Sequence, residues 1–175
     1  RWNGQLTELS SSGKIPIRLM SPTKVSISPE QASLGQTTFS ISDGHIHIDQ
    51  LQWTPQDWKT RGNFTGIALL PGEHPELKQP FLHLGGHWDF TSNTQLTGNL
   101  HIHREKGDWY LPGEVPQPIG LEIMQLKLAA RDEKIAGKFE LISQYIGTAD
   151  AHLTLPIQQS SHRWSISEHA PLSGE

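Results

Sequence analysis

The chain has 175 residues, a net charge of −4 and no cysteine. This length fits a single domain, and the mild acidity without basic clusters argues against a nucleic-acid partner. The lack of cysteine excludes disulfides and thiol-based zinc sites or nucleophiles. Sixteen glycines, twelve prolines and only 34% hydrophobic residues are typical of an all-β domain. No stretch approaches the roughly 18 apolar residues of a transmembrane helix, and no signal peptide is recognisable.

Short runs of alternating apolar and polar residues occupy the first part of the chain. They lie at 2–6, 15–19, 25–27 and 39–41, and Asp43-Gly44 predicts a tight turn before the next run. The alternation then slips by one residue twice, between Ile48 and Leu51 and again after Gly66. A slip of this kind predicts a β-bulge. The proline-rich residues 71–80 predict the first long loop.

The clearest alternation runs from Leu82 to Ile102, where the large apolar residues take even positions with Gly86 and Gly98, and the odd positions are polar apart from Gly85. A polar break at 92–94 divides the run, which predicts an antiparallel hairpin with one dry and one wet face. Glycines recur on the dry side two positions from a large apolar residue, as Gly98 precedes Leu100. This pattern favours a sheet that curves.

The remainder of the chain predicts further strands and brings the total to about a dozen. A polar turn at 105–108 and an irregular proline-rich loop at 112–118 come first. A strand with slipped parity follows at 121–128, and cleaner alternations lie at 135–141, 151–155 and 164–166. Residues 121–131 also allow a helical interpretation, but the period of two fits them equally well.

The ten histidines raise a metal hypothesis, because His45 and His47 point to the same face of a predicted strand. The string from Asp43 to Asp49 resembles the first strand of metal-dependent amidohydrolases. Those enzymes are (β/α)₈ barrels of about 250 residues, and this chain is too short and lacks the helices. Six histidines lie on the wet side of their strands, so we expect no metal, no cofactor and no catalytic role: His45, His47, His83, His87, His101 and His103.

The six tryptophans raise the possibility of a carbohydrate-binding platform. Trp53, Trp88 and Trp164 share the parity of neighbouring aliphatic residues, which favours a place on the dry face, whereas the faces of Trp58 and Trp109 stay open. No Gly-x-Ser-x-Gly motif is present, and the glycine pair at 85–86 sits inside a strand. We therefore expect that the chain is not an enzyme.

The order and spacing of these segments resemble the TamB family, the inner-membrane subunit of the bacterial translocation and assembly module, within the AsmA-like group of bridge-like lipid transfer proteins. The resemblance is carried by the runs at 82–90 and 96–113, supported by 44–53, 60–66 and 121–141. It implies a periplasmic β structure folded lengthwise into a half-open trough, called a β-taco. It further implies phospholipid transfer between the membranes, or outer-membrane protein assembly with the partner TamA, and a parent protein anchored in the inner membrane. On this basis, we expect residues 1–175 to be one segment excised from a longer protein, with TamA contacted by the full-length protein and not by this segment directly.

The dry face needs a cover, because each exposed Leu- or Phe-sized side chain forgoes about 1.5–3 kcal/mol. A closed sandwich would supply that cover itself, whereas a trough leaves room for acyl chains. Parity does not separate the two, and the resemblance favours the trough. The alternatives are a chaperone-like platform that pairs with unfolded outer-membrane β-strands, and a closed sandwich that binds sugar or protein. The expected groove lining is Ile46, Ile48, Trp53, Phe64, Leu84, Trp88, Phe90, Leu100, Ile102, Phe139, Leu141, Leu153 and Trp164.

Overall fold

The computed structural model describes all residues except 14, 70–81, 112–115, 161–162, 167–172 and 175, and over this part the chain is all-β. None of these residues forms a helix, and therefore none forms a helix that could span a membrane. The strands are β1 (Trp2–Leu6), β2 (Ser10–Ser11), β3 (Ile17–Leu19), β4 (Thr23–Ser28), β5 (Gln31–Leu34), β6 (Thr37–Ile41), β7 (Gly44–Trp53), β8 (Trp58–Leu69), β9 (Leu82–Ser92), β10 (Leu96–Gly107), β11 (Tyr110–Leu111), β12 (Gln117–Pro118), β13 (Leu121–Arg131), β14 (Lys134–Ser143), β15 (Gly147–Ser160), β16 (Arg163–Ile166) and β17 (Ser173–Gly174).

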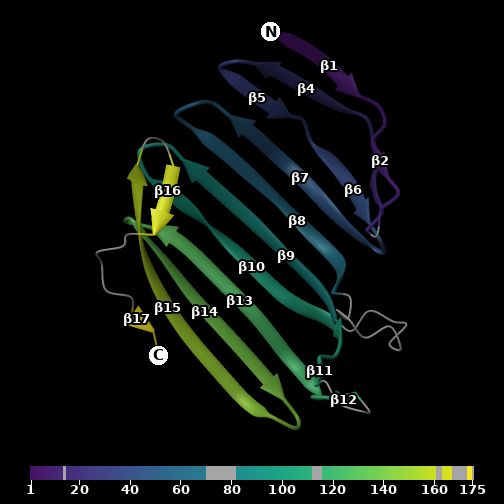
Figure 1. Ribbon diagram of the computed structural model, residues 1–175, viewed down its shortest axis with the longest axis vertical. Coiled ribbons are helices and arrows are strands. Elements are labelled where there is room, and N and C mark those ends of the chain that lie inside the picture. Colours follow the sequence, from purple (N-terminus) through teal and green to yellow (C-terminus); the bar gives the residue numbers. More distant parts are fainter. Residues whose placement is uncertain (14, 70–81, 112–115, 161–162, 167–172, 175) are drawn as a thin grey trace.

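Fifteen of these strands form one antiparallel sheet, and β11 and β12 form a separate pair. The main path runs β1-β4-β5-β7-β8-β9-β10-β13-β14-β15-β16, with β6 also on β7 and β17 on β15. Figure 1 shows these strands stacked from the N-terminal end to the C-terminal end of the molecule. In the described part of the chain β1 and β16 do not meet, so the sheet is not closed.

The hairpin predicted around Leu82 to Ile102 is confirmed as β9 and β10, joined at Asn93–Gln95. Both predicted bulges are present as shifts in register, one between Ile48 and Gln50 and one between Phe64 and Ile67. At the second bulge Gly66 has a φ of 64°, a conformation that glycine adopts without steric cost. The two slips in alternation therefore marked real irregularities of the sheet.

Several predicted boundaries are wrong. Residues 105–107 were expected in a turn but extend β10, with a register shift between Arg104 and Lys106. The turn before β7 is formed by Ser42 and Asp43, one residue earlier than predicted, and Ser42 has a φ of 49°. Residues 117–118 of the expected proline-rich loop form β12. The predicted loop at 71–80 lies outside the described residues.

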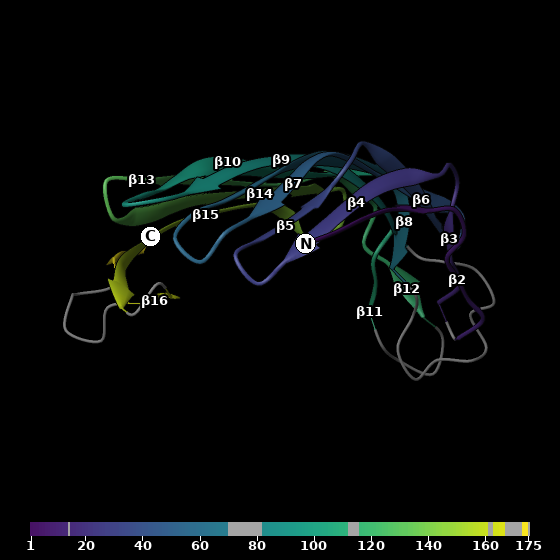
Figure 2. The same ribbon diagram turned by 90° about the horizontal axis from the view of Figure 1, so that it is seen from above.

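The sheet is arched, and Figure 2 shows β16 on one side and β11 with β12 on the other, all on the concave side. The buried hydrophobic side chains gather where these elements meet the sheet. Two clusters form, one of Leu82, Ile119 and Leu121 and the other of Leu96, Ala130 and Ile157. Together with Leu19 these are the buried hydrophobic residues of the described part of the chain. The core therefore sits at the two ends of the long strands.

Candidate functional site: the concave apolar face

The predicted lining residues lie on the concave face in rows that cross the sheet. One row follows the register from Ile48 through Gly62, Trp88, Leu100, Leu128 and Gly137 to Leu153. The next row runs through Ile46, Phe64, Gly86, Ile102, Leu126 and Phe139. Alternation along each strand and register between strands together bring these side chains onto one face.

Three aromatic side chains on this face each stand opposite a glycine on the neighbouring strand. The pairs are Trp88 with Gly62, Phe64 with Gly86, and Phe90 with Gly98. A Cβ atom added to each glycine would lie 2.6–2.7 Å from the partner ring, so each ring occupies the place of the missing side chain. The rings consequently lie across the neighbouring strand, an arrangement known to stabilise glycine in sheets.

Trp88 is fixed further by a polar contact within this apolar surface. Its indole Nε1–H donates to the Thr60 hydroxyl at 2.8 Å, which satisfies the indole nitrogen, and its ring stacks 6.4 Å from that of Phe64 at 29°. The two stacked rings contribute a large apolar area to this face.

The two ends of the long strands are covered by other parts of the chain. At one end Leu84 and Leu141 pack against the cluster of Leu82, Ile119 and Leu121. At the other, Trp164 of β16 packs with Phe90 against the second cluster. The Trp164 indole N–H also donates to the Ser92 hydroxyl at 2.8 Å. These contacts hold β16 against the concave face.

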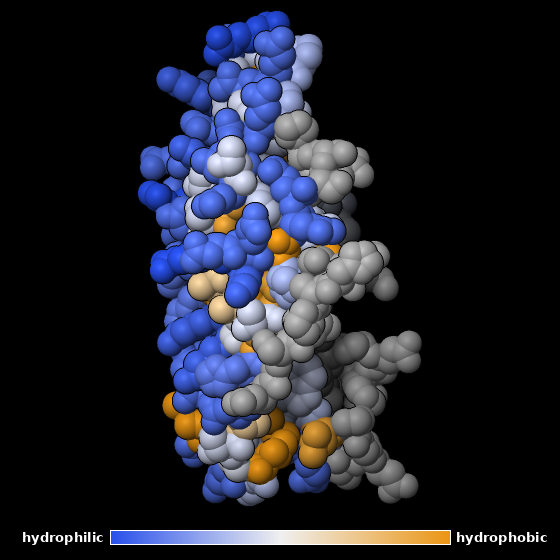
Figure 3. Space-filling model, turned by 90° about the vertical axis from the view of Figure 1, so that its left-hand side faces the viewer, coloured by the Kyte–Doolittle hydropathy of each residue, from blue (hydrophilic) through white to orange (hydrophobic). Residues whose placement is uncertain are grey.

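Between the two ends, the apolar side chains of this face are only partly buried. Trp53 is 45% exposed and Leu153 is 43% exposed, although both lie in long strands. At the N-terminal end Ile27, Leu34 and Leu51 join Trp53 in lining an open apolar hollow of about 290 Å³. From the side, hydrophobic residues gather near the lower end of a mostly hydrophilic surface (Figure 3).

Several residues of this face were not among the predicted lining residues. Leu126 and Leu128 share the parity of Ile102 and Leu100 across the sheet and belong to the same rows. Trp58, whose face was left open, packs against the second cluster, whereas Trp109 is 48% exposed. Parity within each strand was the available signal for Leu126 and Leu128, but the slip near Ile123 obscured it.

The histidines of the described strands lie on the opposite, polar face, namely His45, His47, His83, His87, His101, His103 and His152. His47 contacts the Thr38 hydroxyl at 2.8 Å through Nδ1 and Asp49 at 3.3 Å through Nε2. Over the described ranges, no group of three or more His, Asp or Glu side chains is placed to hold a metal ion. The pairing of His45 with Thr65 and of His47 with Asn63 supplies no acidic ligand across the strands.

Asp108 connects the β11–β12 pair to the sheet. Its carboxylate accepts hydrogen bonds from the backbone N–H groups of Trp109 at 2.7 Å, Gly120 at 3.0 Å and Leu121 at 3.1 Å. Three bonds to one carboxylate fix the chain where it leaves the sheet and returns. They also position Ile119 and Leu121 in the first cluster.

Replacing Asp108 with alanine is therefore expected to lower the free energy of unfolding by about 2 kcal/mol, since hydrogen bonds to a charged group contribute more than neutral ones. Denaturant unfolding measures this loss, and amide exchange should increase first at Gly120 and Leu121. Asp150→Ala, at an exposed site in β15, is the control and should leave both unchanged. Equal effects of the two variants would contradict this role of Asp108.

These features define an all-β protein with a large antiparallel sheet that does not close and an apolar concave face. Comparison with protein-family models, with curated proteins and with solved structures found no match. Membership in the TamB family thus stays a prediction from the sequence.

Proposed function

We propose that this chain is a non-enzymatic segment of a hydrophobic conduit, in which the sheet forms a half-open trough for phospholipid acyl chains. The observation that carries the proposal is the partly exposed apolar surface between the two covered ends of the strands. Each CH₂ group that leaves water for such a surface contributes about 0.8 kcal/mol. An acyl chain would therefore gain from lying along the rows of Leu100 and Ile102.

The shape of the lining supports movement along it. The rings of Trp88, Phe64 and Phe90 lie over glycines of the neighbouring strands. Contacts with an acyl chain would be many, weak and non-directional, because dispersion and apolar burial have no preferred orientation. An acyl chain bound in this way could move along the face, because it would not have to escape from a single deep binding site.

The cellular setting of this proposal comes from the resemblance to the TamB family. This resemblance would put the segment in the periplasm, within a protein anchored in the inner membrane, and would connect it with outer-membrane biogenesis. TamA would then be a partner of the full-length protein and not of this segment directly. In the same setting, the conduit would carry phospholipid, support outer-membrane protein assembly, or do both.

Native mass spectrometry of the purified chain tests the conduit proposal. We expect mass adducts that correspond to co-purified phospholipid, because the concave face is apolar and partly exposed. Removal of the lipid by organic extraction should abolish the adducts, and addition of phospholipid should restore them. A lipid-free mass under all conditions, with the fold intact, would favour a closed sandwich.

The open sheet edge supports a second candidate, a chaperone-like platform. Among the described strands, β1 pairs only with β4, so its outer edge has backbone groups free for a further strand. An unfolded outer-membrane β-strand could add to such an edge by augmentation. Trp2, 57% exposed, would lie beside the added strand. A photo-crosslinker at Gln5 that captures peptide and no lipid would favour this candidate.

A further inference from the structure

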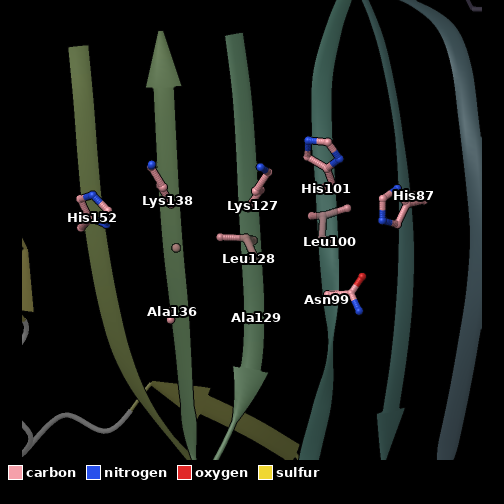
Figure 4. Close-up of a pocket in the computed structure, with 11 residues that line it drawn as sticks. His87, Asn99, Leu100, His101, Lys127, Leu128, Ala129, Ala136, Lys138 and His152 are labelled. Atoms are coloured by element: carbon pink, nitrogen blue, oxygen red, sulfur yellow. The ribbon is translucent and has the colours of Figure 1, made fainter.

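The polar face carries a row of basic side chains from five neighbouring strands, which we call the basic row. Register pairs join His87 to His101, Lys127, Lys138 and His152 in succession. Neighbouring strands lie about 4.8 Å apart, so the row spans roughly 19 Å. Figure 4 shows the five side chains side by side across the strands.

An open hollow of about 490 Å³ lies along the basic row. Ala129 and Ala136 pair with each other in the sheet and leave space because their side chains are small. Asn99, paired with Ala129, supplies an amide at the margin. The hollow therefore combines small side chains with basic groups along one side.

Lys127 and Lys138 stand directly opposite each other, and like charges in that position destabilise a sheet. The ion pairs recorded in the described part of the chain, His47 with Asp49 and Arg61 with Asp89, involve neither lysine. The other acidic groups on this face near the row are Glu140, which accepts a hydrogen bond from Gln125, and Asp150 on β15. Neither lysine is thus in an ion pair among the described residues, although both stand beside the hollow.

His101 adds an unsatisfied polar atom to this charge. Its Nε2 atom is buried without a hydrogen-bond partner, and its ring lies 5.4 Å from that of His87 and 5.3 Å from that of His103. Burial lowers the pKa of His101, and a hydrogen bond with the Gln125 side chain partly offsets this by raising the pKa. The nearby basic groups of His103, Lys127 and His87 lower the pKa further by electrostatic repulsion. A bound anion would act against these lowering influences, since it favours the protonated ring.

We propose that the basic row is a binding site for a phosphate-bearing anion, held by Lys127 and Lys138 with His101 and His152 on either side. Phosphate oxygens accept the charge-assisted hydrogen bonds that lysine and protonated histidine donate. A diphosphate is long enough to contact both lysines. The site lies on the face opposite the apolar lining, so it does not depend on the conduit proposal.

Titration of the full chain with inorganic pyrophosphate, followed by calorimetry and by the histidine ring signals in NMR, tests the site. Binding should strengthen as the pH is lowered, because a bound anion favours the protonated ring of His101, whose pKa is lowered in the free chain. The double variant Lys127→Gln/Lys138→Gln should bind about tenfold or more weakly, since each lost bond involves a charged group. The control Lys24→Gln/Lys59→Gln has the same net charge, also alters exposed lysines of the polar face, and should bind as the unmodified chain does.

A second measurement distinguishes a free phosphate from a lipid headgroup. Vesicles of phosphatidylcholine, with and without phosphatidylglycerol, are sedimented with each variant. Sedimentation that needs phosphatidylglycerol and both lysines, without pyrophosphate binding, would assign the phosphate to a headgroup. Equal weakening in the two double variants, or no binding of either probe by the folded unmodified chain, would overturn the proposal.

Discussion

Replacing Leu100 with aspartate is expected to abolish lipid crosslinking while the protein still folds. Leu100 lies in the middle of β10, between its register partners Trp88 and Leu128, and belongs to neither buried cluster. A carboxylate at this place would interrupt the apolar row that an acyl chain is proposed to follow. Aspartate in an open face stays hydrated, so it avoids the cost of burying an unpaired charge.

The measurement uses a photo-reactive phenylalanine analogue at Phe139, in the neighbouring row, with phospholipid added to the purified chain. The Leu100→Asp background should reduce lipid adducts about tenfold or more. Several CH₂ groups of the acyl chain would lose part of the ~0.8 kcal/mol that each gains on leaving water for the apolar face. The free energy of unfolding should fall by only about 1–1.5 kcal/mol, since Leu100 is partly buried in the folded chain. Thr97→Asp, on the polar face of the same strand, is the control and should change neither quantity.

Unfolding of the Leu100→Asp variant would contradict the open trough. In a closed sandwich the new carboxylate would be buried without a partner, and such a change destabilises a domain far more than the loss of a half-buried leucine. Leu84→Lys is a weaker test of the same idea. Leu84 packs against the buried cluster at the end of β9, so its replacement would disturb the fold in either architecture.

The face to which each side chain points could be predicted from the sequence for most of the chain. Alternation is a local property, and the slips after Ile48 and Gly66 marked the bulges that reverse it. Near Ile123 the prediction was less accurate, because the register shift lies between Leu121 and Ile123, earlier than the slip in the pattern suggested. Ile123 is 40% exposed as a consequence, and Met124 packs against the first cluster.

Strand ends and contacts between distant strands could not be predicted in the same way. Polar residues at 105–107 suggested a turn, yet Glu105 accepts a hydrogen bond from the backbone N–H of Gly66 at 2.8 Å and belongs to β10. The basic row depends on the register of five strands, which alternation within one strand does not determine. Lys127 and Lys138 are neighbours because of the register between their strands, which alternation along the sequence does not show.

The pairing of aromatic rings with glycines leads to the last prediction, that Gly98→Ala destabilises the sheet far more than Gly137→Ala. Both glycines lie on the concave face of long strands. Gly98 has a φ of 147°, and a Cβ atom there would lie 2.1 Å from the Asp89 carbonyl oxygen and 2.6 Å from the Phe90 ring. Gly137 lacks a positive φ, and its nearest neighbour would be the flexible end of Leu128 at 3.0 Å.

For Gly98→Ala, strain at the backbone contributes about 1–3 kcal/mol and overpacking a similar amount, so we expect a loss of about 3–5 kcal/mol. For Gly137→Ala, a small clash is offset by the lower chain entropy of the unfolded state, which leaves a change within about 1 kcal/mol. Denaturant unfolding of the two variants measures the difference. Similar losses would mean that any glycine on this face serves only to remove bulk. A large difference would instead tie the fold to the particular glycine that receives the Phe90 ring.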